Sequence, residues 1–225
     1  CGPSGNQHHT VEDPVEFRMR GINQVQVNNK AGMTFAAALR SILRADPDVV
    51  LIGEIRDQET ANIAIEASLT GHLVLSTLHT NDAPSAVTRL TEMGVEPFLL
   101  SSSLAAVMAQ RLARRLCKKC KRQDTATEAE LRTLGVPHMP DTPLPTIWRP
   151  VGCRECANTG YSGRVAIQQV MGVDSTMEDL IARGATSIDI DKAAKEQGMT
   201  TLRKDGWQKA LQGITSVEEV LRVTV

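Results

Sequence analysis

The 225-residue sequence contains no apolar run long enough to cross a membrane, because its longest apolar segments have only the length of a β-strand. Its first residues do not resemble a signal peptide. Positive and negative charge nearly cancel, leaving a net charge of −1, so the chain as a whole does not attract nucleic acid or anionic lipid. We therefore expect a cytoplasmic chain that does not insert into a membrane and reaches one only through protein partners.

The most informative segment present is D-P-D-V-V-L-I-G-E-I-R-D at residues 46–57. Pro47 ends any preceding helix, and the aliphatic run 49–52 is typical of a strand buried on both faces. Glu54 then follows the carboxyl end of that strand, at the edge of an open α/β sheet where ligands bind. A carboxylate there can polarise a water molecule or support a magnesium ion, although a single Glu after an apolar run is more often a solvated turn.

Three other polar motifs occur at strand-like positions: C-G-P-S-G-N at residues 1–6, T-V-E-D-P-V-E at 10–16 and L-V-L-S-T-L-H-T-N at 73–81. The first looks like the opening of a glycine-rich phosphate loop, and the last is a second buried-type strand. Each alone has a structural explanation, as a flexible end, a turn or a core histidine. Together they place several polar strand ends in series, as in a phosphoryl-transfer site. The motifs supply Gly2, Pro3, Ser4, Gly5, Glu12, Glu16 and His79.

The order T-V-E-D-P-V-E, D-P-D-V-V-L-I-G-E-I-R-D and T-G-H-L-V-L-S-T-L-H-T-N resembles the secretion ATPase superfamily, the hexameric motors of type II secretion and type IV pilus assembly. The resemblance extends from Cys1 to Val225. It implies a RecA-like parallel-sheet P-loop ATPase core that hydrolyses ATP with Mg²⁺ between the subunits of a homo-hexamer. It also implies partners in the inner-membrane platform and the cytoplasmic adaptors of the machine, at the cytoplasmic face of the inner membrane.

The resemblance assigns roles to single residues. Glu54 resembles the Walker B catalytic Glu, Glu12 and Glu16 resemble the Asp-box acids, and His79 resembles the His-box residue near the γ-phosphate. Arg56, in the same motif as Glu54, is a further candidate catalytic residue.

The phosphate loop departs from the G-x-x-x-x-G-K-[ST] form. Gly2 to Gly5 supply only its first half, and the chain then passes through Gln7 directly to the Asp box. This link is too short for the crossover of a parallel βαβ unit. We interpret the chain as a fragment in which the loop helix and an amino-terminal domain are missing; the sequence has no Walker A lysine. Arg18 and Arg20 belong either to a neighbouring subunit's site or to a solvated turn.

Two C-x-x-C pairs, at residues 117–120 and 153–156, provide the second strong signal. Each pair can offer two thiolates to one tetrahedral ion. Redox or disulfide pairs are the alternative, which a cytosolic chain disfavours. The motor family carries a similar tetracysteine subdomain here. The predicted ligands of a structural Zn²⁺ ion are Cys117, Cys120, Cys153 and Cys156.

A run of basic residues surrounds the first pair and has no acid within it. A zinc-stabilised basic module can bind nucleic acid, but this run lacks interleaved aromatic residues for base stacking, and basic residues at a helix end also offset the helix dipole. We expect a solvated face or a protein contact, and no nucleic-acid partner. The run comprises Arg111, Arg114, Arg115, Lys118, Lys119, Lys121 and Arg122.

Periodicity and capping residues predict the elements that carry these motifs. A strand, helix, strand order from 49 to 76 predicts a parallel sheet. Segment 123–150 is predicted to be a loop with one short helix at 128–134. Helices are otherwise predicted at 35–44, 57–70, 84–93, 187–197, 202–211 and 216–223, with a strand at 165–167. The predicted domains are a RecA-like core at 1–116, a zinc subdomain at 117–164 and a strand and helical tail at 165–225.

The sequence thus predicts an ATP-hydrolysing motor of type II secretion that powers pseudopilus assembly and protein export. A type IV pilus assembly motor is the alternative, and V-E-P-F-L-L-S-S-S-L at 95–104 is slightly closer to the type II branch. Two other classes stay open. The missing lysine is compatible with a non-catalytic scaffold module, and RecA-like cores also serve nucleic-acid translocases.

Overall fold

The computed structural model describes residues 7–139 and 141–224. The chain forms two compact units. Among the described residues, the sheet unit comprises residues 7–106 and 172–192, and the cysteine unit comprises residues 107–139, 141–171 and 193–224. The three domains expected from the sequence, with boundaries after residues 116 and 164, stay a prediction. Among the described residues, no helix has both the length and the apolar character needed to span a bilayer.

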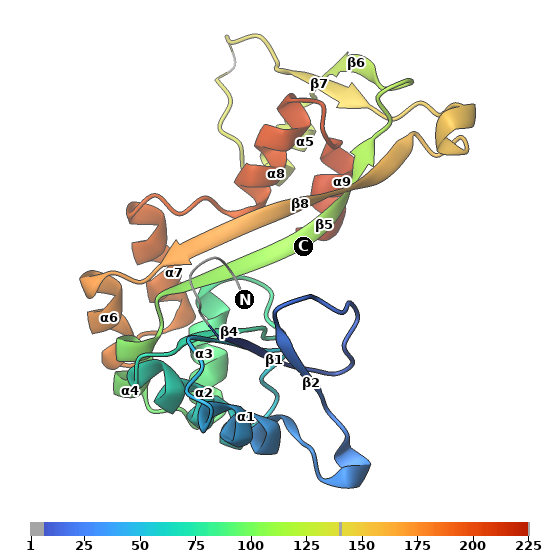
Figure 1. Ribbon diagram of the computed structural model, residues 1–225. Coiled ribbons are helices and arrows are strands. Elements are labelled where there is room, and N and C mark those ends of the chain that lie inside the picture. The colour runs from blue at the N-terminus through green and yellow to red at the C-terminus, as the bar shows by residue number, and fades with distance from the viewer. Residues whose placement is uncertain (1–6, 140, 225) are drawn as a thin grey trace. The chain divides into compact units, whose positions relative to one another are not determined.

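The sheet unit contains a four-stranded parallel sheet in the order β2-β1-β3-β4, which confirms the predicted parallel sheet (Figure 1). In the register, Thr10 pairs with Gln24 on one side and with Leu51 on the other. Because the strands are parallel, their carboxyl ends meet at one edge. The strands are β1 His8–Glu12, β2 Asn23–Gln26, β3 Val49–Ile52 and β4 Leu73–Ser76.

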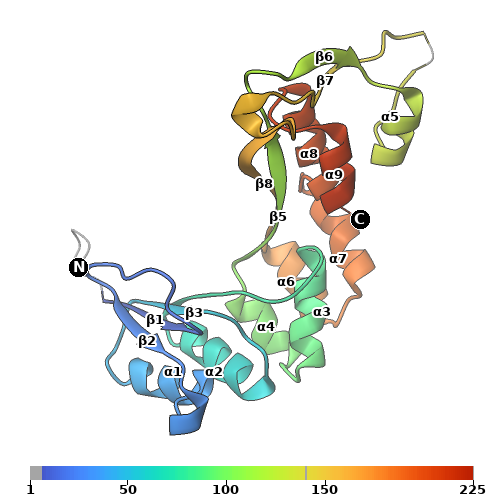
Figure 2. The ribbon, with the colours of Figure 1, turned by 90° about the vertical axis from the view of Figure 1, so that its right-hand side faces the viewer.

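Caps are found at two of the predicted helix starts, to within one residue of the prediction. Thr34 Oγ1 accepts a hydrogen bond from the backbone N–H of Ala37, and Asp57 Oδ1 accepts one from Thr60 N–H. Figure 2 shows α1 and α2 on the same face of the sheet. The helices of this unit are α1 Phe35–Leu43, α2 Gln58–Leu69, α3 Pro84–Glu92, α4 Pro97–Ser103 and α6 Ser175–Ala182, with the short 3-10 helix η1 Asn29–Ala31. Helix α7, Ser187–Glu196, crosses the boundary between the units.

The core of the sheet unit lies between the sheet and α1 and α2. Val11, Val50 and Ile52 are fully buried there. On the opposite face, Leu73 and Leu75 of β4 are 55% and 47% exposed. The prediction that β4 is a buried strand is therefore wrong, because the described helices cover only one face of the sheet.

The cysteine unit is built on a two-stranded sheet of β5 Ala106–Leu116 and β8 Tyr161–Gly172. Helices α8 and α9 lie beside these strands (Figures 1 and 2). Backbone contacts fix this packing, since Leu116 N–H donates to the carbonyl of Ile214 and Gln168 N–H donates to Asp205. The helices of the unit are α5 Glu128–Leu134, α8 Leu202–Leu211 and α9 Val217–Val223, with the 3-10 helix η2 Arg154–Cys156.

Two expectations for this unit are corrected. The predicted loop 123–150 contains α5 as expected, but strands β6 Arg122–Thr125 and β7 Thr146–Arg149 pair antiparallel at its two ends. The arginines of the basic run lie on strands, with Arg111, Arg114 and Arg115 on β5 and Arg122 on β6, so they cannot offset a helix dipole. An apolar core joins β5, β7, β8 and the three helices around Leu131, Ile147, Ile167, Trp207 and Val220.

Candidate active site and tetracysteine centre

Glu54 lies at the carboxyl edge of the parallel sheet, directly after β3. Its side chain is only 11% exposed, whereas its two partners are largely solvated. Glu54 Oε2 lies 2.9 Å from Nε2 of His79, and Glu54 Oε1 forms an ion pair with Arg56. The structure therefore brings together Glu54, His79 and Arg56, three of the residues predicted from the sequence.

Hydrogen bonds between neighbouring strand ends fix the backbone beneath Glu54. Gly53 N–H donates to the carbonyl of Val11 at 2.7 Å, and Thr77 Oγ1 donates to the Gly53 carbonyl at 2.6 Å. A Cβ atom at Gly53 would lie 3.1 Å from Val11 O and 3.5 Å from the ring of Phe35. A side chain at this position would therefore crowd the end of β1, and its absence lets the strand ends approach each other closely.

Glu12 lies at the end of β1, and its carboxylate is held by uncharged donors. Thr10 Oγ1 donates to Glu12 Oε1 at 2.5 Å, and Gln24 Nε2 donates to the same oxygen at 2.9 Å. Thr10 and Gln24 can converge on one oxygen because they are register partners on adjacent strands. Sequence reasoning missed both residues, and it also missed Thr77.

The two glutamates border one cavity of about 360 Å³, which we call the acid cleft. Glu16 also lines it from the exposed segment between β1 and β2. Carboxylates meeting at the carboxyl edge of a parallel sheet can hold a divalent cation or orient a water molecule. The lining residues are Glu12, Asp13, Pro14, Glu16, Phe17, Met19, Phe35, Leu51, Gly53, Glu54 and Thr77.

Other predicted residues are not part of the acid cleft. Gly2, Pro3, Ser4 and Gly5 lie outside the described residues. His79 lines a separate cavity of about 300 Å³ beside α3, together with Arg89 and Glu92. Strand β1 already begins at His8, so the described chain has no helix directly before the Asp box.

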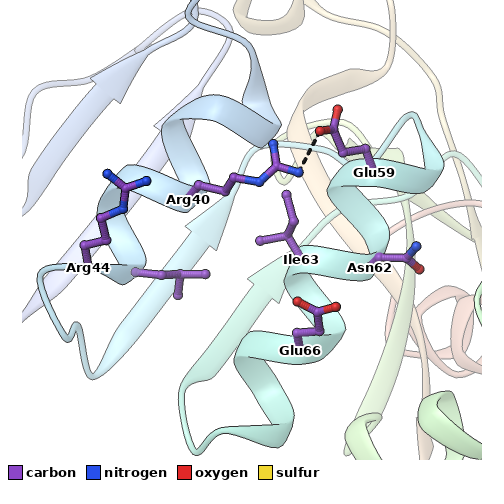
Figure 3. A pocket seen from close by; sticks show the side chains of 7 residues that line it. Arg40, Arg44, Glu59, Asn62, Ile63 and Glu66 are labelled. Atoms are coloured by element: carbon purple, nitrogen blue, oxygen red, sulfur yellow. Dashed lines mark ion pairs between the residues drawn. The ribbon is translucent and has the colours of Figure 1, made fainter.

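A further hollow lies between α1 and α2 (Figure 3). Arg40 projects from α1 and Arg44 from the residue directly after it, whereas Glu59 and Glu66 project from α2. Arg40 Nη2 lies 2.7 Å from Glu59 Oε1, and both side chains are more than half exposed. This hollow shares no lining residue with the acid cleft, and its ion pair is of the solvated kind that contributes little.

The four predicted cysteine ligands converge in the cysteine unit, where their sulfur atoms all lie within 4.8 Å of one another. The sulfurs of Cys117 and Cys153 are 3.9 Å apart, and those of Cys120 and Cys156 are 3.8 Å apart. A tetrahedral zinc site with Zn–S bonds of about 2.3 Å has sulfur separations of about 3.8 Å, so the residues fit this metal. The same distances are far too long for disulfide bonds.

The surroundings of the sulfurs shift the pKa values of two of the thiols in opposite directions. Desolvation acts to raise the pKa of Cys156, but hydrogen bonds from the backbone N–H groups of Cys153 and Gly160 and from neighbouring thiols lower it to about 6. Desolvation raises the pKa of Cys120 to about 11, despite the N–H of Gly152. A bound cation would favour the thiolate form of all four sulfurs.

Comparison with known proteins identifies the relatives of the chain. Residues 4–222 match the family described as "Type II/IV secretion system protein". The chain is 55% identical over 215 residues to type II secretion system protein E of Pseudomonas aeruginosa, covering 96% of this chain and 42% of the relative. It is 52% identical over 216 residues to the type IV pilus assembly ATPase PilB of Thermus thermophilus, covering 96% of this chain and 24% of the relative. The chain thus spans less than half the length of these relatives.

Solved structures support the fold. The pilus retraction motor PilT with bound ADP has a TM-score of 0.69 at 24% identity, covering 97% of this chain and 52% of that one. The Legionella pneumophila ATPase DotB has a TM-score of 0.67 at 20% identity, covering 99% and 52%. The expected ATPase fold is thereby confirmed. On the family match over nearly its whole length, the chain belongs to the type II/IV secretion system protein family, with relatives in both the secretion and the pilus branches.

Proposed function

We propose that this chain is the ATPase region of a type II secretion motor, in which Glu54 orients or deprotonates the water that attacks ATP. The observation that carries the proposal is the nearly buried Glu54 carboxylate at the sheet edge, held by His79 and Arg56 and bordering the same cleft as Glu12. The names of the relatives support this activity, since pilus assembly proteins at 52% identity are described as ATPases.

Each described residue has a role set by its position. Glu54 takes up or directs the proton of the attacking water, Glu12 binds in the network of the metal and its water, and Glu16 adds negative charge at the rim. His79 and Arg56 have exposed side chains, so they can turn from Glu54 towards an incoming γ-phosphate. Bound Mg²⁺ supplies the charge that neutralises the β- and γ-phosphate oxygens.

The proposal includes assembly into a homo-hexamer in the cytoplasm, at the face of the inner membrane, where platform and adaptor proteins hold the ring. None of the described residues that line the acid cleft is basic. Phosphoryl transfer relies on positive charge around the phosphates, so we assign the missing cations to arginines of a neighbouring subunit and to the phosphate loop. No nucleic acid takes part.

The tetracysteine centre is proposed to bind one structural Zn²⁺ ion. All four ligands come from the protein, which leaves no position for a catalytic water. The ion would join the turn after β5 to the turn before β8 and so stabilise the cysteine unit.

The direct test is E54Q in the full-length protein, with E59Q as the matched control. The first variant should lower ATP turnover by at least about a hundredfold while nucleotide binding persists, because a positioned base contributes on that scale. Glu59 pairs with Arg40 outside the cleft, so E59Q should hydrolyse ATP like the wild type. Unchanged turnover in E54Q would remove Glu54 from the mechanism.

The choice of machine is tested by complementation. Expression of the full-length gene should restore protein export in a strain that lacks its type II secretion ATPase, but not piliation in a strain that lacks its pilus assembly ATPase. The reverse result would assign the pilus function. A full-length protein that binds no ATP would instead be a scaffold, and hydrolysis stimulated by DNA with a steep salt dependence would indicate a translocase.

A further inference from the structure

We propose that Gln24, on β2, is a positioning residue for the acid cleft, which fixes the Glu12 carboxylate and the segment between β1 and β2. This inference rests on the proposed function and deepens it. Gln24 lies outside all of the motifs recognised in the sequence, and it does not line the cleft itself. It therefore acts through Glu12 and not by touching the substrate.

The Gln24 amide makes three hydrogen bonds, which use both of its donor hydrogens and its oxygen. Its Nε2 donates to Glu12 Oε1 and to the carbonyl of Phe17, both at 2.9 Å, and its Oε1 accepts from the backbone N–H of Met19 at 2.8 Å. A backbone N–H can only donate and a carbonyl can only accept, so these two contacts fix which end of the amide is nitrogen. The donor end therefore has to face Glu12.

The contacts of Glu12 are one-sided. Its Oε1 receives both Gln24 and Thr10, whereas no hydrogen bond to its Oε2 is found within residues 7–139 and 141–224. Two uncharged donors hold the carboxylate in place without supplying a countercharge. One oxygen is thus restrained, and because neither donor is charged, the carboxylate has no countercharge from these contacts and can face a cation or its bound water.

Gln24 also shapes the wall of the cleft. Phe17 and Met19 both line the cleft, yet they are 76% and 48% exposed, so little packing holds their segment in place. The two backbone contacts of Gln24 connect this segment to β2. One amide thereby couples the position of Glu12 to the position of the cleft wall.

The chain provides a matched control in Gln26, which lies two residues further along the same face of β2. Gln26 Oε1 accepts from Val15 N–H at 3.2 Å, so it also holds the segment between β1 and β2. Among the described residues, the Gln26 side chain makes no hydrogen bond to the Glu12 carboxylate, unlike that of Gln24. A comparison of the two glutamines therefore separates positioning of the carboxylate from general support of the segment.

The experiment measures kcat, KM for Mg-ATP and the half-saturating Mg²⁺ concentration for wild type, Q24M, Q24E, Q26M, T10V and E12Q in the full-length protein. Q24M should lower kcat about tenfold and raise the Mg²⁺ requirement, because one hydrogen bond to a charged acceptor is lost. T10V should have a similar effect without touching the segment, which covers the case in which Q24M does not fold. Q26M should stay within about twofold of wild type.

Q24E provides the readout that a merely structural role would not change. It keeps an acceptor for Met19 N–H, so support of the segment alone predicts a milder loss than in Q24M. If Gln24 positions Glu12, the loss of kcat in Q24E should be at least as large as in Q24M, because a second carboxylate then faces Glu12. The inference would be overturned if Q24E lost less kcat than Q24M, or if Q24M and Q26M had equal kcat. E12Q should lose turnover in either case, because Glu12 belongs to the proposed function itself. A wild-type protein without hydrolysis would overturn the proposed function, and this inference with it.

Discussion

The substitution E219Q should destabilise the cysteine unit more than any other single charge removal there. Glu219 lies on α9 with a side chain that is 1% exposed. Its carboxylate accepts hydrogen bonds from the backbone N–H of Arg114 at 2.9 Å, from the Arg114 guanidinium at 2.6 Å, and from two nitrogens of Arg222 at 2.8 Å. These contacts join α9 to β5.

The magnitude follows from the pKa of Glu219. Desolvation acts to raise this pKa, but hydrogen bonds from Arg222 and Arg114 lower it from 4.5 to about 2. A shift of that size corresponds to about 3 kcal/mol between the folded and unfolded states. The two arginine side chains are 49% and 54% exposed and regain water when the charge is removed, so we expect E219Q to lower the free energy of unfolding by about 2 kcal/mol at pH 7.

The sign of the pH dependence follows from the lowered pKa. A carboxyl group whose folded-state pKa lies below its unfolded value stabilises the fold above the unfolded pKa. That stabilisation is lost as the pH falls from 4.5 towards about 2. The stability difference between wild type and E219Q should therefore be constant near neutral pH and shrink across this acidic window.

The assay is urea unfolding followed by tryptophan fluorescence. Both tryptophans, Trp148 and Trp207, lie in the cysteine unit, so the signal reports that unit alone. E218Q is the matched control: Glu218 is the neighbouring residue, is 51% exposed and pairs with Arg149, so its loss should cost less than about 1 kcal/mol. Equal costs for the two variants, or a difference that persists unchanged at pH 2.5, would refute the reasoning.

Two further predictions concern the same unit. Removal of Zn²⁺ with a strong chelator should lower the thermal midpoint of the cysteine unit by at least about 10 °C, and added Zn²⁺ should restore it. The thermal midpoint of a double C120S/C156S variant should not respond to either treatment. Zinc-free protein that melts like the loaded form would contradict a structural metal. G206A should lower the free energy of unfolding by about 1 kcal/mol, measured by urea unfolding, because the added Cβ would lie 2.6 Å from Val220 Cγ1. This loss is expected although Ala favours helices more than Gly does. A more stable variant would show that α8 and α9 can move apart.

The sequence was sufficient where one residue determines a local structure. Thr34 caps its helix as expected, Asp57 lies one residue from the predicted start of its own, and the C-x-x-C spacing predicted the convergence of four sulfurs. It was insufficient for β5. This strand is rich in Ala, Leu and Arg, and exposed apolar residues such as Met108 and Leu112 alternate with buried Ala109 and Ala113, so no clear period of two is visible.

The meeting of Glu12 and Glu54 was predictable because the carboxyl ends of parallel strands share one edge. The support from Gln24 was not predictable. It depends on the register that places Gln24 opposite Thr10, and nothing in the short polar segment 23–26 specifies that register. The exposure of Leu73 was missed for a related reason, since an apolar strand sequence does not reveal which of its faces a helix covers.

The charges of the acid cleft constrain how a nucleotide can bind there. Four of its described lining residues, Glu12, Asp13, Glu16 and Glu54, are acids. The two side chains paired with Glu54, those of Arg56 and His79, do not line the cleft. Phosphate oxygens alone would be repelled by such a surface, whereas a hard divalent cation prefers oxygen ligands of this kind. Under the proposed function, a nucleotide would therefore approach these residues through its metal ion, and the groups that neutralise its phosphates would come from outside the residues that line the acid cleft.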